Sequence, residues 1–116
     1  MTRILVDTDV LVDHLRGHRR FKPMKDAVHI SSVTRAELFA GRSTDETRVR
    51  RLLASFSELP VDAPVAERAG RIRRTSGLGL ADALIAATAI HHRLTLVTRN
   101  VRHFGAVSGV RVRAPS

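Results

Sequence analysis

Two spacings of hydrophobic residues alternate along the chain. Short apolar runs such as residues 3–6 and 94–98 are typical of buried strands. Other apolar residues, such as Val10, Leu11 and Leu15, are spaced so that they share one face of a helix. Helices that alternate with short strands indicate an α/β fold with a mainly parallel sheet. The predicted strands are 3–6, 28–30, 59–61, 94–98 and, as a last candidate, 107–112.

Capping residues and glycines set the expected limits of the helices. Ser, Thr and Asp accept hydrogen bonds from the free amides of a first helical turn, and glycine commonly ends a helix. A helix from Leu80 to His92 is the most apolar of the set. The other predicted helices begin at Thr8, at Ser31 or Ser32, at Thr44 and at Asp62; the first ends at Gly17, the second at Ala40 and the last at Arg74, before a loop at 75–79.

Length and composition restrict the class of protein. The chain has 116 residues, 43% of them hydrophobic and 27% charged, which predicts a single folded domain over 1–116. It has no cysteine, which excludes disulfides, thiolate metal sites and a cysteine nucleophile. No stretch is apolar enough to span a membrane, and Asp7 falls where a secretion signal would be apolar. We therefore expect a cytoplasmic protein without a membrane partner.

The formal net charge of +9 points to a polyanionic partner. No acidic residue follows Asp82, whereas five arginines do. The aromatic residues are four phenylalanines, so a nucleic acid would be held mainly through its phosphates rather than by stacking of its bases. The alternative is that the arginines are simply solvated surface residues.

Three acidic residues occupy positions that a structural role explains poorly. Asp7 follows the first strand, at the edge of a parallel sheet where ligand sites form. Glu37 shares a helical face with apolar neighbours, and Asp82 lies on the apolar face of the most hydrophobic helix. The alternatives are that Asp7 is a cap, that Arg35 or Arg42 pairs with Glu37, and that Asp82 stabilises a helix start.

These three carboxylates would repel one another strongly if the fold brought them together. At about 4 Å, two unit charges repel by about 4 kcal/mol at an effective dielectric of 20. An all-oxygen cluster is suited to a hard cation such as Mg²⁺ or Mn²⁺. Such an ion beside a basic surface makes hydrolysis of phosphodiester bonds the natural chemistry.

Four segments in a fixed order resemble the PIN-domain family and, within it, the VapC toxins of bacterial toxin–antitoxin pairs. Each segment is weak alone, but the four together cover nearly the whole chain. They are ILVDTDVL at 4–11, SVTRAEL at 32–38 with Gly41, DALIAATA at 82–89, and LVTRN at 96–100 with His103 and Phe104.

The resemblance implies an α/β/α sandwich around a parallel sheet and an endoribonuclease that depends on Mg²⁺ or Mn²⁺, with no organic cofactor. It also implies a homodimer and a cognate VapB-type antitoxin. Its metal-binding and catalytic acids correspond to Asp7, Glu37 and Asp82, with Thr8 as an auxiliary polar residue. Asn100 stands where many relatives carry a fourth catalytic acid. Since an amide is a neutral ligand, the number of metal ions stays open.

Other polar residues near these segments have two interpretations each. Asp9 is close enough to Asp7 to support it, or it belongs to a solvated face. Arg99 and Arg102 flank Asn100 and either contact RNA phosphates or are solvated. His103 either acts near the site or has a structural role beside Phe104, and the structural role is the favoured expectation.

Other functions fit the sequence less well. The run Asp7-Thr8-Asp9 also resembles the haloacid-dehalogenase phosphatases, but the chain lacks the later lysine and acidic pair of those enzymes. A non-catalytic nucleic-acid-binding domain would explain the charge but not the three acids. An inactive PIN homologue that only sequesters its partner is the third alternative.

Overall fold

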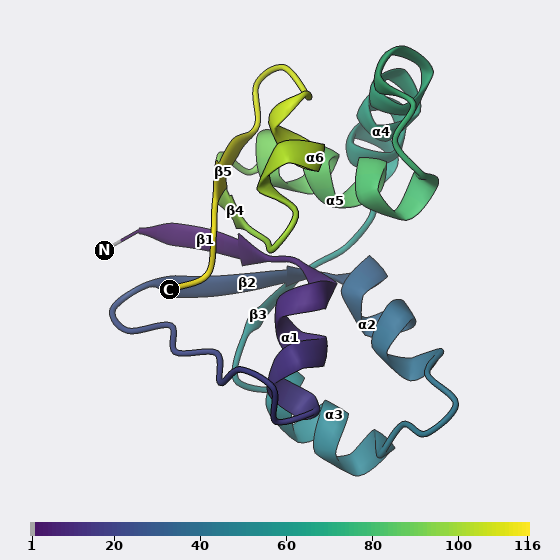
Figure 1. Ribbon diagram of the computed structural model, residues 1–116. Helices are drawn as coiled ribbons and strands as arrows, with labels where there is room; N and C mark the ends of the chain where they lie inside the picture. The colour runs from purple at the N-terminus through teal and green to yellow at the C-terminus, as the bar shows by residue number, and fades with distance from the viewer. Residues whose placement is uncertain (1) are drawn as a thin grey trace.

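Strands and helices alternate along the chain (Figure 1). The structure is a computed structural model that describes residues 2–116. The elements are β1 (Arg3–Val6), α1 (Thr8–Leu15), β2 (Ala27–Ser31), α2 (Ser32–Phe39), α3 (Glu46–Leu53), β3 (Ser57–Leu59), α4 (Ala63–Ser76), α5 (Leu80–His91), β4 (Thr95–Val97), α6 (Val101–Gly105) and β5 (Arg111–Arg113).

The five strands form one parallel sheet in the order β3-β2-β1-β4-β5. Strand β1 is central, and its Leu5 lies between His29 of β2 and Leu96 of β4. Because all strands run the same way, their carboxyl ends share one edge. The chain leaves that edge at Asp7 after β1 and at Thr98 after β4, so residues far apart in sequence meet there.

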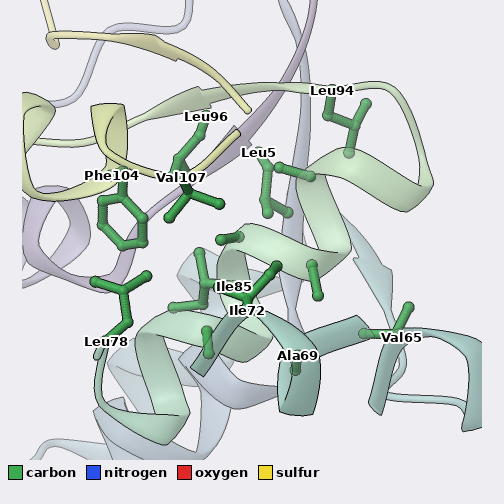
Figure 2. Packing of buried hydrophobic residues seen from close by; sticks show 14 residues of the cluster. Leu5, Val65, Ala69, Ile72, Leu78, Ile85, Leu94, Leu96, Phe104 and Val107 are labelled. Carbon is green, nitrogen blue, oxygen red and sulfur yellow. The ribbon is translucent and has the colours of Figure 1, made fainter. Parts of the chain in front are cut away.

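Helices cover both faces of the sheet, which confirms the predicted three-layer α/β/α sandwich. Figure 1 shows α1, α2 and α3 on one side of the sheet and α4, α5 and α6 on the other. Two separate hydrophobic clusters correspond to these two layers. Figure 2 shows the cluster under α4, α5 and α6, with Phe104 near one end and Val65 near the other.

Strand β1 is apolar throughout its buried part because both of its faces are covered. Ile4 and Val6 belong to the cluster under α1, α2 and α3, whereas Leu5 belongs to the other. Successive side chains of a strand point to opposite faces, so each layer receives residues from the same strand. All three are fully buried, and they hold the end of β1, and with it Asp7, in the interior.

Two predicted helix caps were wrong by one residue. Asp7, not Thr8, caps α1, since its Oδ1 accepts a hydrogen bond from the Thr8 amide at 2.8 Å. Asp45, not Thr44, caps α3 through the Arg48 amide. In both places the threonine hydroxyl is used elsewhere: that of Thr44 donates to the carbonyl oxygen of Leu38 at 2.9 Å. The predicted caps at Ser31 and Asp62 are confirmed.

The predicted third strand lies earlier than expected, at Ser57–Leu59 rather than 59–61. Pro60 has no amide hydrogen to donate to a neighbouring strand, which favours an end of the strand before it. The last strand is shorter and later than predicted, at Arg111–Arg113. Helix α6 was not predicted, because five residues with one buried side chain, Phe104, give no helical period.

Helix α4 ends two residues later than predicted, since Thr75 and Ser76 belong to it and not to the following loop. Their hydroxyls donate to main-chain oxygens one turn back, at Arg71 and Ile72. Gly77 ends the helix in the left-handed conformation, with φ at 75°, which glycine adopts without strain. Within residues 2–116, no helix has the length and apolar character needed to cross a membrane.

Phe104 is a test of the packing under α6. The side chain is completely buried, so we expect Phe104→Ala to lower the free energy of unfolding by about 3–5 kcal/mol through lost contacts and a residual cavity. Urea denaturation measures the change. Met24, which is 82% exposed, provides the control: Met24→Ala should stay within about 0.5 kcal/mol of the parent. Equal destabilisation by the two variants would contradict the packing described.

Candidate functional site

Asp7 is a buried carboxylate at the carboxyl edge of the sheet. Its side chain is only 5% exposed. Oδ1 accepts from the Thr8 amide, and Oδ2 accepts from the Thr98 hydroxyl at 2.8 Å. Thr98 is itself fully buried and directly follows β4. The ends of two adjacent strands therefore hold this carboxylate in one orientation.

Burial raises the pKa of the Asp7 carboxyl from 3.8 to about 7. The nearby carboxylate of Asp9 adds to the rise in pKa, and that of Asp82 contributes a smaller part. The hydrogen bonds from Thr98 and Thr8 lower the pKa but do not offset these effects. Burial likewise raises the pKa of Asp9, against the hydrogen bond from the Arg99 amide. Negative charge at this edge is therefore costly unless a cation accompanies it.

Glu37 reaches this edge from α2, but its side chain is exposed. The expectation that it lies on a mostly buried face was wrong, because α2 turns only Thr34 and Leu38 fully inward. The Thr8 hydroxyl donates to Glu37 Oε1 at 2.6 Å and lies 3.0 Å from Thr34 Oγ1. Thr8 therefore joins the first turn of α1 to Glu37.

Asp82 lies in the first turn of α5 and is also less buried than expected. Its side chain is 38% exposed, and Oδ2 lies 3.1 Å from His103 Nε2 of α6. The apolar face of α5 begins with Ala83 and Ile85, so Asp82 stands at the margin of that face. His103 contacts the ring of Phe104, as its structural interpretation expected, and it also contacts Asp82, as the alternative of a place near the site allowed.

The segment after β4 carries the remaining predicted residues. Arg99 donates from its backbone amide to Asp9 Oδ2 at 3.1 Å, and its guanidinium donates to Asp13 at 3.0 Å. The backbone amide of Asn100 donates to the Thr98 hydroxyl. The Asn100 side chain is exposed beside the start of α6. Arg102 is exposed on α6.

The three predicted acids share an edge, but they do not form a closed cluster. Within residues 2–116, no three His, Asp or Glu side chains come close enough together to form a ready metal-binding group. Each acid instead has its own donor: Thr98 for Asp7, Thr8 for Glu37 and His103 for Asp82. Unneutralised carboxylates repel one another, which favours this separated arrangement.

The chemistry of these side chains nevertheless fits a hard divalent cation. Every atom with which these carboxylates could bind a metal ion is an oxygen. Mg²⁺ commonly uses only one or two carboxylates together with water and phosphate. Asp9 Oδ1 is buried and has no hydrogen-bond partner among the described residues, and Asp7 is buried beside it. A cation would offset the burial and the repulsion by Asp9 that together raise the pKa of Asp7.

Sequence reasoning missed Thr98 and Thr34 as part of this site. Thr98 closes an apolar strand and Thr34 lies inside a short helix, so each has the local appearance of a structural residue. The signal that the sequence holds for Thr98 is its position directly after an apolar run of strand length. Only the structure shows that this strand pairs with the one that Asp7 follows. For Thr34 the sequence holds no such signal.

A groove lies next to Glu37, between α1, α2 and α3. Its volume is about 490 Å³. Apolar side chains of Val12, Leu15, Leu38 and Val49 line it, and Arg16, Arg42 and Arg48 contribute positive charge. Since Glu37 also lines the groove, the groove opens directly onto the candidate site.

A family model and several known proteins match this chain. A family model described as PIN domain matches residues 4–109. Ribonuclease VapC10 of Mycobacterium tuberculosis is 48% identical over 113 residues, covering 87% of this chain and 85% of that protein. Ribonuclease VapC19 of the same organism is 36% identical, covering 86% of this chain and 90% of that protein.

Solved structures show the same fold. A toxin–antitoxin complex from Klebsiella pneumoniae contains a chain with a TM-score of 0.82 and 34% identity, covering 97% of this chain and 98% of that one. VapBC2 from Rickettsia felis, bound to a DNA fragment, contains a chain with a TM-score of 0.83 and 20% identity, covering 99% of this chain and 100% of that one. The family model spans most of the chain, and the sequence relatives match over most of their length. The chain therefore belongs to the PIN-domain family and, within it, to the VapC proteins.

Proposed function

We propose that this protein is an endoribonuclease that requires Mg²⁺ or Mn²⁺ and acts as the toxin of a toxin–antitoxin pair. The observation that carries the proposal is the buried Asp7 carboxylate, whose pKa of about 7 reflects burial next to Asp9 and Asp82. Relatives that are 48% and 36% identical bear the name ribonuclease. A cytoplasmic location follows from the proposed RNA substrate.

Asp7, Glu37 and Asp82 would hold the metal ion. When bound, the ion would supply polarisation of a phosphoryl oxygen and a lower pKa for the attacking water. The chain's own residues orient the ligands: Thr98 fixes Asp7 Oδ2, and Thr8 fixes Glu37 Oε1. His103 restrains Asp82 in the same way.

The basic surface would bind the RNA backbone. The net charge of +9 favours a polyanion, and exposed Arg102 lies near the site, on α6. Asn100, also exposed, offers a neutral oxygen where a fourth acid would bind a second ion more tightly. We therefore propose that one metal ion is held firmly and that any second ion is held weakly.

The groove next to Glu37 supports an antitoxin partner of the VapB type. Its lining combines apolar residues with three arginines, against the two acids Glu37 and Asp45, and this matches an amphipathic segment that carries acidic residues. A segment bound there would also cover the approach to Glu37, which accounts for neutralisation. We include a homodimer in the proposal, since Leu80 and Val101 are large apolar side chains left exposed at the starts of α5 and α6.

Asp82→Asn is expected to lower RNA cleavage by about 100-fold or more, because a ligand charge worth several kcal/mol in the transition state is lost. Cleavage of total cellular RNA with Mg²⁺, and again in excess EDTA, measures the effect. RNA binding by the variant should persist. Glu67→Gln, an exposed acid on α4, is the matched control and should keep full activity. Unchanged cleavage in EDTA would contradict the metal requirement and favour a different nuclease mechanism.

The raised pKa of Asp7 predicts a pH dependence of stability. Between about pH 4 and about pH 7 the folded protein binds one more proton at Asp7 than the unfolded chain, so the free energy of unfolding falls as pH rises. Each tenfold change in proton affinity corresponds to about 1.4 kcal/mol. The free energy of unfolding should therefore be roughly 4 kcal/mol lower at about pH 8 than at about pH 4.

The comparison of the parent protein with Asp7→Asn, in EDTA, isolates this contribution. The variant should melt at a higher temperature than the parent at about pH 8, and the difference should shrink at about pH 4. Thermal unfolding followed by circular dichroism measures both. Mg²⁺ should raise the Tm of the parent at about pH 8 and not that of the variant. A difference in Tm that is independent of pH would show that Asp7 is not held with a raised pKa.

Arg42→Glu is expected to weaken the complex with the antitoxin about tenfold or more, since it places an acid at the groove that an acidic segment would enter. Coexpression with the product of the neighbouring gene, followed by titration of the purified proteins, measures the affinity. Arg71→Glu makes the same charge change on α4, in the opposite layer, and should leave the affinity unchanged. Equal weakening by the two variants would assign the effect to net charge rather than to the groove.

A further inference from the structure

We propose that Asp9, Asp13 and Arg99 form a clamp that positions the catalytic carboxylate Asp7. The clamp ties the segment after β4 to α1. In this assignment Arg99 is a positioning residue and not a phosphate contact. The inference deepens the proposed nuclease function and rests on it for its kinetic readout, but its contacts can be tested separately.

The clamp holds Arg99 at two points. Asp9 and Asp13 lie four residues apart on α1, so their side chains project from the same face of consecutive turns. Asp9 Oδ2 accepts from the Arg99 backbone amide at 3.1 Å, and Asp13 Oδ1 accepts from Arg99 Nη1 at 3.0 Å. One acid therefore fixes the main chain of Arg99 and the other fixes its side chain.

Thr98 transmits this restraint to the site. Its hydroxyl has one proton, which is donated to Asp7 Oδ2 at 2.8 Å, while Asp9 Oδ2 lies further away at 3.4 Å. The hydroxyl oxygen of Thr98 in turn accepts a hydrogen bond from the backbone amide of Asn100 at 3.0 Å. A shift of Arg99 would therefore move both the donor that orients Asp7 and the backbone that carries Asn100.

The guanidinium of Arg99 already has a carboxylate partner. It contacts Asp13, whose side chain is only 14% exposed, against 54% for Arg99. A phosphate would have to compete with the Asp13 carboxylate for this guanidinium. Ion pairs as exposed as this one contribute little to stability, so substitutions in the clamp should leave the protein folded and affect the reaction instead.

The two interpretations of Arg99 predict opposite effects of Asp13→Asn. If the clamp is correct, Asp13→Asn and Arg99→Gln each lower kcat about tenfold, since small displacements of catalytic groups are costly, while KM stays within about twofold. The double variant is no worse than either single variant. Exchange of the charges, Asp13→Arg with Arg99→Asp, restores most of kcat. If Arg99 binds phosphate, Arg99→Gln raises KM and Asp13→Asn tightens RNA binding, and either result would overturn the proposal.

Two measurements separate failure of the clamp from failure of the proposed function. Amide hydrogen exchange at Arg99 and Asn100 should be faster in both single variants, whether or not the parent cleaves RNA. Mn²⁺ alone, titrated by calorimetry, should bind several-fold more weakly to them, because Asp7 loses its orientation. Arg71→Gln, an exposed arginine on α4, is the control and should change neither. Unchanged exchange at both amides would exclude the clamp, whereas a parent without cleavage but with faster exchange in the variants would exclude only the nuclease.

Discussion

Burial of the Asp7 carboxylate is the constraint on which the rest of the site depends. A carboxylate that is 5% exposed loses its hydration and cannot recover it from two hydrogen bonds alone, so its pKa rises to about 7. The fold keeps it there because β1 is packed on both faces, by Ile4 and Val6 on one side and Leu5 on the other. The strand cannot shift to expose its end without breaking both hydrophobic clusters.

Donor side chains organise the carboxylates around this buried group. Thr98, Thr8 and His103 each contact one of Asp7, Glu37 and Asp82, and each comes from a different segment of the chain. The Thr98–Asp7 contact joins the ends of two strands, the Thr8–Glu37 contact lies within the layer of α1 and α2, and the His103–Asp82 contact lies within the layer of α5 and α6. The site is therefore a product of the whole three-layer arrangement, and no single motif builds it.

Charge is divided between the edge of the sheet and the exterior. The acidic residues that matter for the site lie at the carboxyl edge of the sheet, while most arginines are exposed. Arg99 shows that this division has exceptions, since its guanidinium faces Asp13. The net charge of +9 thus indicates the class of partner, but it does not tell which arginines are free to bind it.

The sequence alone determined the fold class and the segments that carry the site. Both follow from local patterns: apolar runs of strand length, helical spacing, and acids directly after or within those elements. It placed Asp7 correctly at the end of β1 because a buried strand that ends in an acid is visible in four or five consecutive residues. It could not place Thr98 or Thr34, nor choose between the two interpretations of His103, because the partners of these residues lie between 21 and 91 residues away in the chain.

Only the tertiary structure decided how exposed each acid is and which donor holds it. Glu37 and Asp82 share helical faces with apolar residues, yet one is exposed and the other half-exposed, because the depth of a helix face depends on the layer packed against it. The same holds for Arg99, which the sequence leaves between solvent, phosphate and carboxylate. Helical and strand periods report the direction of a side chain, whereas burial and pairing depend on elements that only folding brings alongside.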